Sequence, residues 1–230
     1  MRHLQAIRPT DQRGIALLTA LVLMLAVLLT GIAATRGAMQ GARAAAHERD
    51  RVLAVQMADA ALLDAERDIE GGAAPGSARA HAIAAGSSDA FVPGCRAGRP
   101  YDGLCAHDPD PEREAALLAE ADGPAVVYGS HTGGVMPAGG GLPRAPPRYL
   151  VALLPDAPDG SRLYRVSARG AGSLPGVHAA LEAYYRKPAD GGPGRRIGWR
   201  ELGNWSERHG GADAHAAADP AAGAAVRGRD

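Results

Sequence analysis

The strongest pattern in the chain is an uncharged, mostly apolar run at residues 15–34. At about 1.5 Å of rise per residue, a helix of this length extends roughly 30 Å, which is the thickness of a bilayer's hydrocarbon core. Only Thr19, Thr30 and Gly31 interrupt the run. Threonine is tolerated in lipid because its hydroxyl can bond back to a helix carbonyl. We predict a transmembrane helix over 15–34. A secretory signal is the alternative, although its apolar region is usually only about 7–15 residues long.

The helical pattern continues beyond this run. From residue 52 onward, apolar side chains recur at steps of three and four, the spacing of one helix face. They are Val52, Val55, Ala58, Leu62, Ala65 and Ile69, and the opposite face carries Glu48, Arg51, Asp59, Glu66 and Arg67. Gly71, Gly72 and Pro75 then end the pattern. The sequence therefore predicts one helix from about Gly14 to Ile69, half of it in lipid and half on a soluble domain.

Small side chains at four-residue spacing lie between the two halves. One row consists of Ala33, Gly37, Gly41 and Ala45, and a second consists of Thr30, Ala34, Ala38, Ala42 and Ala46. Such rows let two helix backbones approach closely, most of all at the Gly37-x-x-x-Gly41 unit. One interpretation is a helix-packing role for the first row. The other is a generally alanine-rich sequence.

Beyond residue 70 the pattern predicts a small domain made mainly of strands. Residues 71–110 are rich in Gly, Ser, Pro and Ala, and we expect them to be mostly irregular. Asp110, Pro111 and Glu112 are typical of a helix start, and this helix should run to about Ala121. Strands are predicted at 125–128, 149–154, 163–169 and 178–186, and their short turns favour an antiparallel meander. We expect the amphipathic half of the long helix to cover its apolar face, which makes an α+β fold.

Both tryptophans, Trp199 and Trp205, lie at residues 197–205. We expect them to cap the edge of the core, and a ligand-stacking site is the alternative. The tail at 208–230 is composed mainly of Ala, Gly and Asp, which predicts disorder.

Composition limits the possible functions. The chain has 25 basic and 25 acidic side chains and a formal net charge of zero, so it carries no electrostatic footprint for nucleic acid. Apolar residues make up 46% of the chain but aromatic residues only 4%. Because much of the apolar fraction is alanine, which buries little area per residue, we expect one small core.

The only two cysteines, Cys95 and Cys105, lie close together in a Gly/Pro-rich segment. Such a pair suits a disulfide outside the cytoplasm. The alternative is a zinc site with His81 or His107 as further ligands, but no Cys-x-x-Cys pair is present.

Other candidate chemistry is limited. Four acidic residues, Asp108, Asp110, Glu112 and Glu114, suggest calcium but lack the EF-hand spacing. Ser130, His131 and Asp122 could imitate a hydrolase set, but they are sequence neighbours in a Gly-rich loop, and no nucleophile-elbow, phosphate-loop or zinc-protease motif is present. We therefore expect that the protein is not an enzyme and that it binds no metal or cofactor.

Four segments resemble PilX-type minor pilins of the type IV pilus. Residues 12–18, Gln-Arg-Gly-Ile-Ala-Leu-Leu, are similar to the group's basic leader, cleavage glycine and opening apolar run. Residues 49–62 resemble its Arg-Asp-Arg and Gln-x-Ala-Glu-x-Ala-Leu helix motif, with Asp59 where Glu is usual. Residues 164–170, Tyr-Arg-Val-Ser-Ala-Arg-Gly, resemble the family's late strand, and residues 198–201, Gly-Trp-Arg-Glu, resemble the endings of its members; both resemblances are looser.

This resemblance implies a domain plan and a processing route. Residues 1–14 would be a prepilin leader, 15–70 the long helix, 71–207 a periplasmic globular domain and 208–230 the tail. Prepilin peptidase would cut after Gly14 on the cytoplasmic face, and Ile15 would become the N-methylated amino terminus. The mature chain would cross the inner membrane once, with its amino terminus in the cytoplasm.

The resemblance also implies a function. Major pilins carry a glutamate at the fifth mature position, which neutralises a neighbour's terminal amine, whereas here that position is Thr19. PilX-like minor pilins also lack the glutamate, which fits a priming complex at the filament tip. The implied partners are other minor pilins, the major pilin, prepilin peptidase and the inner-membrane assembly platform. A K-type pseudopilin of type II secretion and a non-pilin domain on a simple anchor remain as alternatives.

Overall fold

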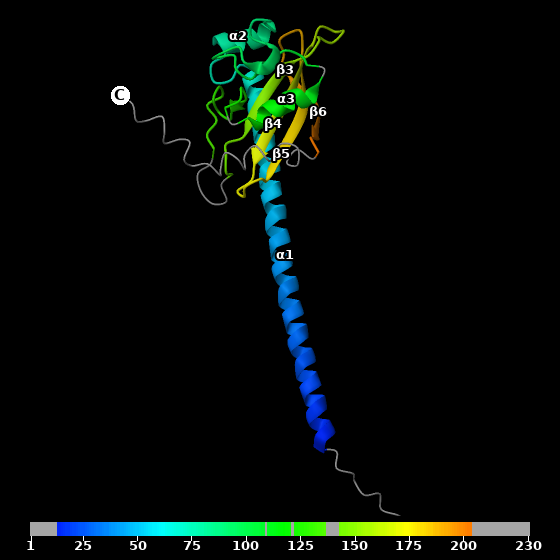
Figure 1. Cartoon of the computed structure of the whole chain (residues 1–230). Coiled ribbons are helices and arrows are strands. Elements are labelled where there is room, and N and C mark those ends of the chain that lie inside the picture. The colour runs from blue at the N-terminus through cyan, green and yellow to red at the C-terminus, as the bar shows by residue number, and fades with distance from the viewer. Residues whose placement is uncertain (1–12, 109, 121, 137–142, 204–230) are drawn as a thin grey trace, which may run out of the picture. The chain divides into compact units, whose positions relative to one another are not determined.

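The computed structural model describes residues 13–203 except 109, 121 and 137–142. The leader residues 1–12, Trp205 and the tail therefore lie outside the described residues. The chain divides into two compact units, residues 1–48 and 49–230. Helix α1 (Arg13–Ile69) is a single helix of 57 residues that contributes to both (Figure 1). The prediction of one helix ending at Ile69 is confirmed. Gly72 follows with a φ of 60°, and its N–H donates to the Arg67 carbonyl at 2.8 Å, which closes the helix.

The second unit is an α+β domain built on one sheet. Its elements after α1 are α2 (Ala78–Ala85), the 3-10 turn η1 (Pro93–Cys95), β1 (Leu104–Cys105), α3 (Pro111–Ala119), β2 (Val126–Val127), β3 (Arg148–Leu153), β4 (Arg162–Ala171), β5 (His178–Lys187) and β6 (Arg195–Glu201). The strand order is β1-β3-β4-β5-β6, with β2 paired to β3. Strands β3, β4 and β5 form the predicted antiparallel meander, and β6 adds a further antiparallel strand beside β5.

This unit departs from the sequence-based expectations at two places. The sheet is mixed, because β1 runs parallel to β3 with Leu104 opposite Val151. Residues 71–110 are mostly irregular, as expected, but they also contain α2, which was not predicted. Ser77 caps this helix by accepting a hydrogen bond from the Ala80 N–H at 3.2 Å, and Gly86 ends it in the left-handed region. These capping signals were present in the sequence but lay in a Gly- and Ala-rich background.

Strand β6 was also not predicted. Its sequence, Arg-Arg-Ile-Gly-Trp-Arg-Glu, lacks a clear apolar alternation, and the strand forms through its ladder to β5. The expectation that the tryptophans cap the core is wrong for Trp199, whose side chain is 61% exposed on this edge strand.

The C-terminal part of α1 packs on one face of the sheet. A single buried cluster joins residues of the helix with residues of β3, β4 and β5; it includes Ala58, Leu62, Ala65, Tyr149, Tyr164, Val166, Ala168, Leu181 and Ala183. The predicted stripe is confirmed from Ala58 to Ile69. It is wrong at its start, because Val52 is 46% exposed and Ala54 is the buried residue there.

Gly170 on β4 sets how closely the helix and sheet approach. A Cβ at this position would lie 2.1 Å from the Ala54 carbonyl oxygen and 2.4 Å from the Ala58 nitrogen. Both atoms belong to the helix backbone and cannot rotate away, so only glycine lets the strand and helix come this close.

Gly170→Ala should therefore destabilise the second unit by about 3 kcal/mol, the upper part of the usual range for overpacking. Chemical denaturation of the full chain in detergent, followed by circular dichroism, measures the change. Gly198→Ala is the matched control, because a Cβ there would meet nothing within 4 Å. Equal stability of the two variants would contradict the close approach.

The opposite face of the sheet is also covered. Helix α3 packs on it through Leu118, beside Leu150, Ala152 and Ala180. Arg165 and Ser167 of β4 lie on this face and are buried. Both contact Glu114 of α3, Arg165 at 2.6 Å and Ser167 at 3.0 Å. Burial raises the pKa of the Glu114 carboxyl, and the hydrogen bond from Arg165 opposes this shift. The sheet is thus the middle layer between two helices.

Candidate functional site: the apolar half of α1

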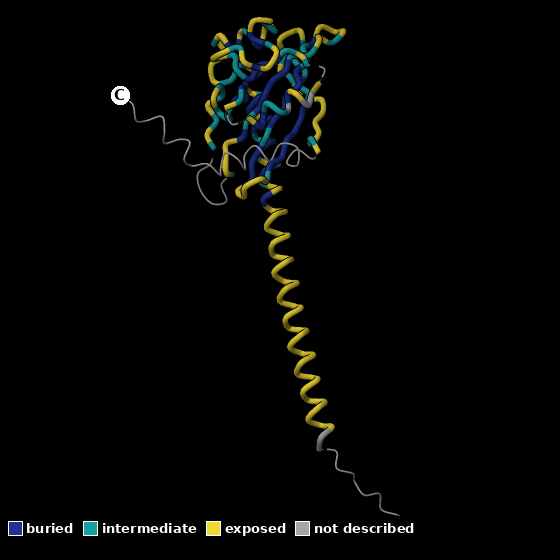
Figure 2. The backbone as a smooth tube through the Cα atoms, in the orientation of Figure 1, coloured by how far each residue is buried: buried dark blue, intermediate teal, exposed yellow. Residues whose placement is uncertain are grey.

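The N-terminal part of α1 exposes large apolar side chains. Residues 15–49 are exposed at every position, as Figure 2 shows in yellow along the helix. The exposed fractions reach 73% at Leu17, 74% at Met24 and 72% at Val27. This helix is long and apolar enough to cross a membrane, and its most apolar stretch contains no buried residue. A continuous apolar surface of this size requires lipid or other protein helices around it.

The threonine hydroxyls within this segment bond to carbonyls of the helix itself. The Thr19 hydroxyl donates to the Ala16 carbonyl at 3.0 Å, and the Thr35 hydroxyl lies 3.0 Å from the carbonyls of Gly31 and Ile32. The Thr30 hydroxyl donates to the Ala26 carbonyl. These bonds leave no threonine hydroxyl dependent on water, which suits an apolar environment.

The start of the segment has no negative charge. The first turn of α1 contains no acidic residue, and Thr19 is neutral. A terminal amine created at Ile15 would therefore find no carboxylate partner among residues 15–47 of its own helix.

The predicted small-residue row lies entirely on exposed helix surface. Ala33, Gly37, Gly41 and Ala45 are all exposed, and a Cβ added at Gly31, Gly37 or Gly41 would meet nothing within 4 Å. No contact with the described residues therefore requires these glycines, although each costs about 1 kcal/mol of helix propensity relative to alanine. Close packing against another helix would explain the two glycines of the row.

Gly37→Ala should separate these two effects. It should stabilise the isolated helix by about 1 kcal/mol but weaken helix packing by about the same amount, lowering recovery of the chain in sheared pili roughly fivefold. Gly31→Ala is the control, since it has the same propensity gain but lies outside the row. Equal recovery of both variants would show that the small-residue row does not pack against another helix.

Three buried aspartates attach the C-terminal part of α1 to its domain. Asp50 accepts hydrogen bonds from the Ser173 N–H at 2.6 Å and the Leu174 N–H at 3.0 Å, in the turn between β4 and β5. Asp64 accepts from the Gly129 N–H at 2.7 Å and from the Thr132 hydroxyl. These bonds hold the helix at one register against the loops that surround it.

Asp68 is the third aspartate and has the strongest partner. Arg79 of α2 donates from Nε and Nη2 to its carboxylate, at 3.0 Å and 2.8 Å, and the Tyr149 hydroxyl donates at 2.9 Å. Burial and the negative charge of Asp68 raise the pKa of Tyr149, so the phenol remains a donor. Sequence reasoning included Asp50 only as part of the Arg-Asp-Arg motif and did not single out Asp64 or Asp68, although all three lie on the buried side of the predicted helix.

Cys95 and Cys105 are joined by a disulfide in the structure, with their Cα atoms 4.2 Å apart. Both are 2% exposed, and the bond ties η1 to β1 beside the Leu118 and Leu150 cluster. Because both sulfurs are used in this bond, the zinc alternative has no thiolate ligands. Among the described residues, no group of three or more His, Cys, Asp or Glu could hold a metal ion.

Most of helix α1 matches a known protein family. Residues 13–63 match the family model described as PilX N-terminal. The chain carries the N-terminal domain of PilX-type pilins. The PilX match begins at the first residue of α1 and includes the exposed apolar segment, the small-residue row and the Asp50 attachment point. No curated protein and no solved structure matches the chain.

The residues of the hydrolase and calcium alternatives do not come together as free groups in one site. Ser130 and His131 line a pocket that does not include Asp122, so the three do not form a hydrolase triad. Glu114 is paired with Arg165, and Asp108 lies 3.5 Å from Arg113, so neither is a free calcium ligand. The PilX segment is therefore the part of the chain on which a functional proposal can be based.

Proposed function

We propose that this chain is a minor pilin that helps to initiate type IV pilus assembly and sits at or near the filament tip. The observation that carries the proposal is the PilX match on a helix whose N-terminal part is wholly exposed and apolar. A pilin uses such a helix twice, as a membrane anchor before assembly and as a packing element in the filament core afterwards.

Processing follows from the same resemblance. Prepilin peptidase would cleave after Gly14, and Ile15 would become the N-methylated amino terminus. The helix would span the inner membrane, with the second unit and its Cys95–Cys105 disulfide in the oxidising periplasm.

The proposed position at the tip depends on Thr19. An ammonium group in a low-dielectric environment is costly without a countercharge. In a growing filament, an incoming subunit with a glutamate at this position neutralises the amine of the subunit before it. A chain with Thr19 cannot do this for a predecessor, so it suits the first place in the filament, in contact with other minor pilins and then the major pilin.

Thr19→Glu tests this position. Immunogold labelling should find the wild-type protein at pilus tips and the Glu variant also along the shaft, since the variant supplies the missing countercharge. Thr19→Gln, which has the same length without the charge, should label like wild type. Wild-type protein distributed evenly along the shaft would contradict the tip assignment.

Mass spectrometry of the native protein tests the processing. We expect a chain that begins at methylated Ile15 and contains the disulfide. A mature chain that keeps Met1 would favour a simple membrane anchor.

A further inference from the structure

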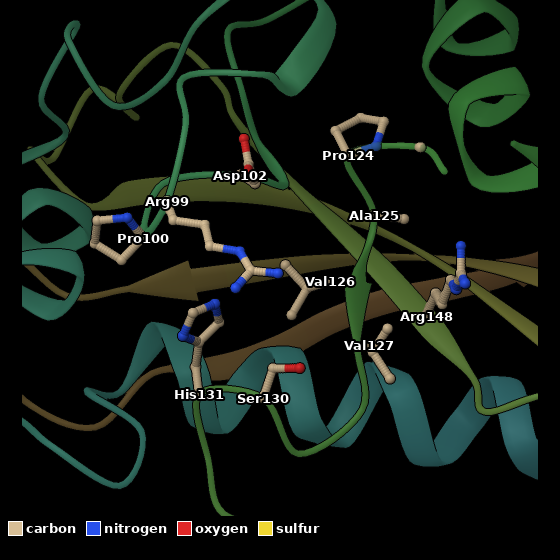
Figure 3. A pocket seen from close by; sticks show the side chains of 11 residues that line it. Arg99, Pro100, Asp102, Pro124, Ala125, Val126, Val127, Ser130, His131 and Arg148 are labelled. Atoms are coloured by element: carbon tan, nitrogen blue, oxygen red, sulfur yellow. The ribbon is translucent and has the colours of Figure 1, made fainter. Parts of the chain in front are cut away.

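A pocket of about 520 Å³ lies in the second unit, away from any residue used in the proposed function. Its walls are the Arg99–Asp102 loop, the segment leading into β2, and the turn at Ser130 and His131 (Figure 3). This volume is within the range of small-molecule sites, about 300–1,000 Å³.

Three polar side chains from two separate segments converge on this pocket. Figure 3 shows the Arg99 guanidinium extending across it toward Val126, above the His131 ring, with Ser130 beside them. Within the part of the chain that the structure describes, the side chains of Arg99, Ser130 and His131 form no hydrogen bond or ion pair. Arg99 and Ser130 are exposed and His131 is half-buried, so all three side chains can reach a ligand in the pocket.

The charges around the pocket favour a single negative charge. Arg99 and Arg148 contribute two positive charges and Asp102 one negative charge, which leaves a net charge of one positive. Asp102 is already engaged, because its Oδ1 accepts a hydrogen bond from the Gly98 N–H at 2.9 Å. Arg148 also has a partner, since its Nη1 donates to the Glu120 carbonyl at 3.2 Å. Arg99 is therefore the cation open to a ligand.

His131 adds a neutral donor rather than a second charge. Its pKa is lowered by burial and then by the positive charge of Arg79, while Asp68 and Asp64 oppose the shift. The ring is consequently neutral at pH 7 and offers one N–H donor. An anion bound beside it would stabilise the charged ring and raise this pKa.

We propose that this pocket binds a small aliphatic monocarboxylate. The planar fork of Arg99 matches the two oxygens of a carboxylate, with Ser130 and His131 as further donors. The apolar side chains of Pro124, Val126 and Val127 provide a surface for the aliphatic part of the ligand. A phosphate dianion would exceed the net charge of the lining. This inference is independent of the pilin assignment, and either can fail without the other.

Titration of the full chain in detergent with butyrate tests the proposal. Nuclear magnetic resonance of histidine-labelled protein, with the His131 signal assigned by His131→Gln, should show butyrate raising the His131 pKa. The uncharged analogue butyramide should leave it unchanged. Arg99→Gln should weaken butyrate binding by about tenfold or more, because a charge-assisted hydrogen bond is lost.

The matched control is Arg96→Gln. Arg96 belongs to the same segment, is exposed, pairs with Glu120 at 2.8 Å and does not line the pocket. Its substitution should leave butyrate affinity unchanged. The proposal is overturned by an unresponsive His131, by equal effects of butyrate and butyramide, by unchanged affinity in Arg99→Gln, or by tighter binding of inorganic phosphate than of butyrate.

Discussion

Gly14→Val should leave the full-length precursor in the membrane and abolish its incorporation into pili. The bond after Gly14 lies in the first turn of α1, where the backbone N–H groups have no partner within the helix. Glycine also weakens the helix locally by about 1 kcal/mol, so this turn can open for a peptidase. Valine would place a branched side chain next to the bond to be cut. Immunoblotting for the precursor and mature forms measures the outcome, and we expect the mature form to fall more than about tenfold.

The control is Gly31→Val, which introduces the same side chain further along the helix. This variant should still be cleaved, because a Cβ at Gly31 meets nothing within 4 Å and the site lies far from the cut. If the Gly14 variant is processed and assembled as efficiently as wild type, the prepilin interpretation fails at its most specific residue.

Arg79→Met should destabilise the second unit by about 3–5 kcal/mol, because it leaves the Asp68 carboxylate buried without its cation. The side chains of both residues are 3% exposed, so water cannot replace the lost partner. Arg79 also donates to the carbonyls of Pro100 and Asp102, at 2.6 Å and 3.0 Å, and these acceptors would lose their donor. Chemical denaturation of the full chain, followed by circular dichroism, measures the loss.

Arg96→Met provides the comparison at an exposed ion pair. The Arg96 side chain is 56% exposed and lies 2.8 Å from Glu120. Exposed pairs contribute about 0–1 kcal/mol, so this variant should remain close to wild type. A cost for Arg79→Met no larger than that for Arg96→Met would mean that the Asp68 pair does not hold α1 in place.

Local pattern was sufficient to predict the long elements. Helix α1 has an uncharged run followed by an amphipathic stripe, and β4 alternates cleanly between Tyr164, Val166 and Ala168 on one face and polar residues on the other. Both patterns involve residues close together in the chain, so they can be recognised without knowledge of the fold. Strand β1 could not be predicted in this way. It consists of only two residues, Leu104 and Cys105, and is a strand because it pairs with β3.

The buried polar groups illustrate the same limit. Asp68 and Glu114 are unremarkable in the sequence, and only the fold brings Arg79 and Arg165 to them. The partners lie 11 and 51 residues away along the chain. A buried charge is acceptable only when such a partner is present, and periodicity contains no information about partners at that distance.

Sequence pattern alone established the membrane-length helix, its amphipathic continuation, the antiparallel strands β3, β4 and β5, and the resemblance to PilX-type pilins. These features depend on hydrophobic period and local motif, which are properties of adjacent residues. The tertiary structure was needed to show that helices cover both faces of the sheet. It was also needed to show that Gly170 lies against the backbone of α1, and that Arg99, Ser130 and His131 line one pocket. Those features depend on contacts between distant segments, whose geometry is set by packing the whole domain at once.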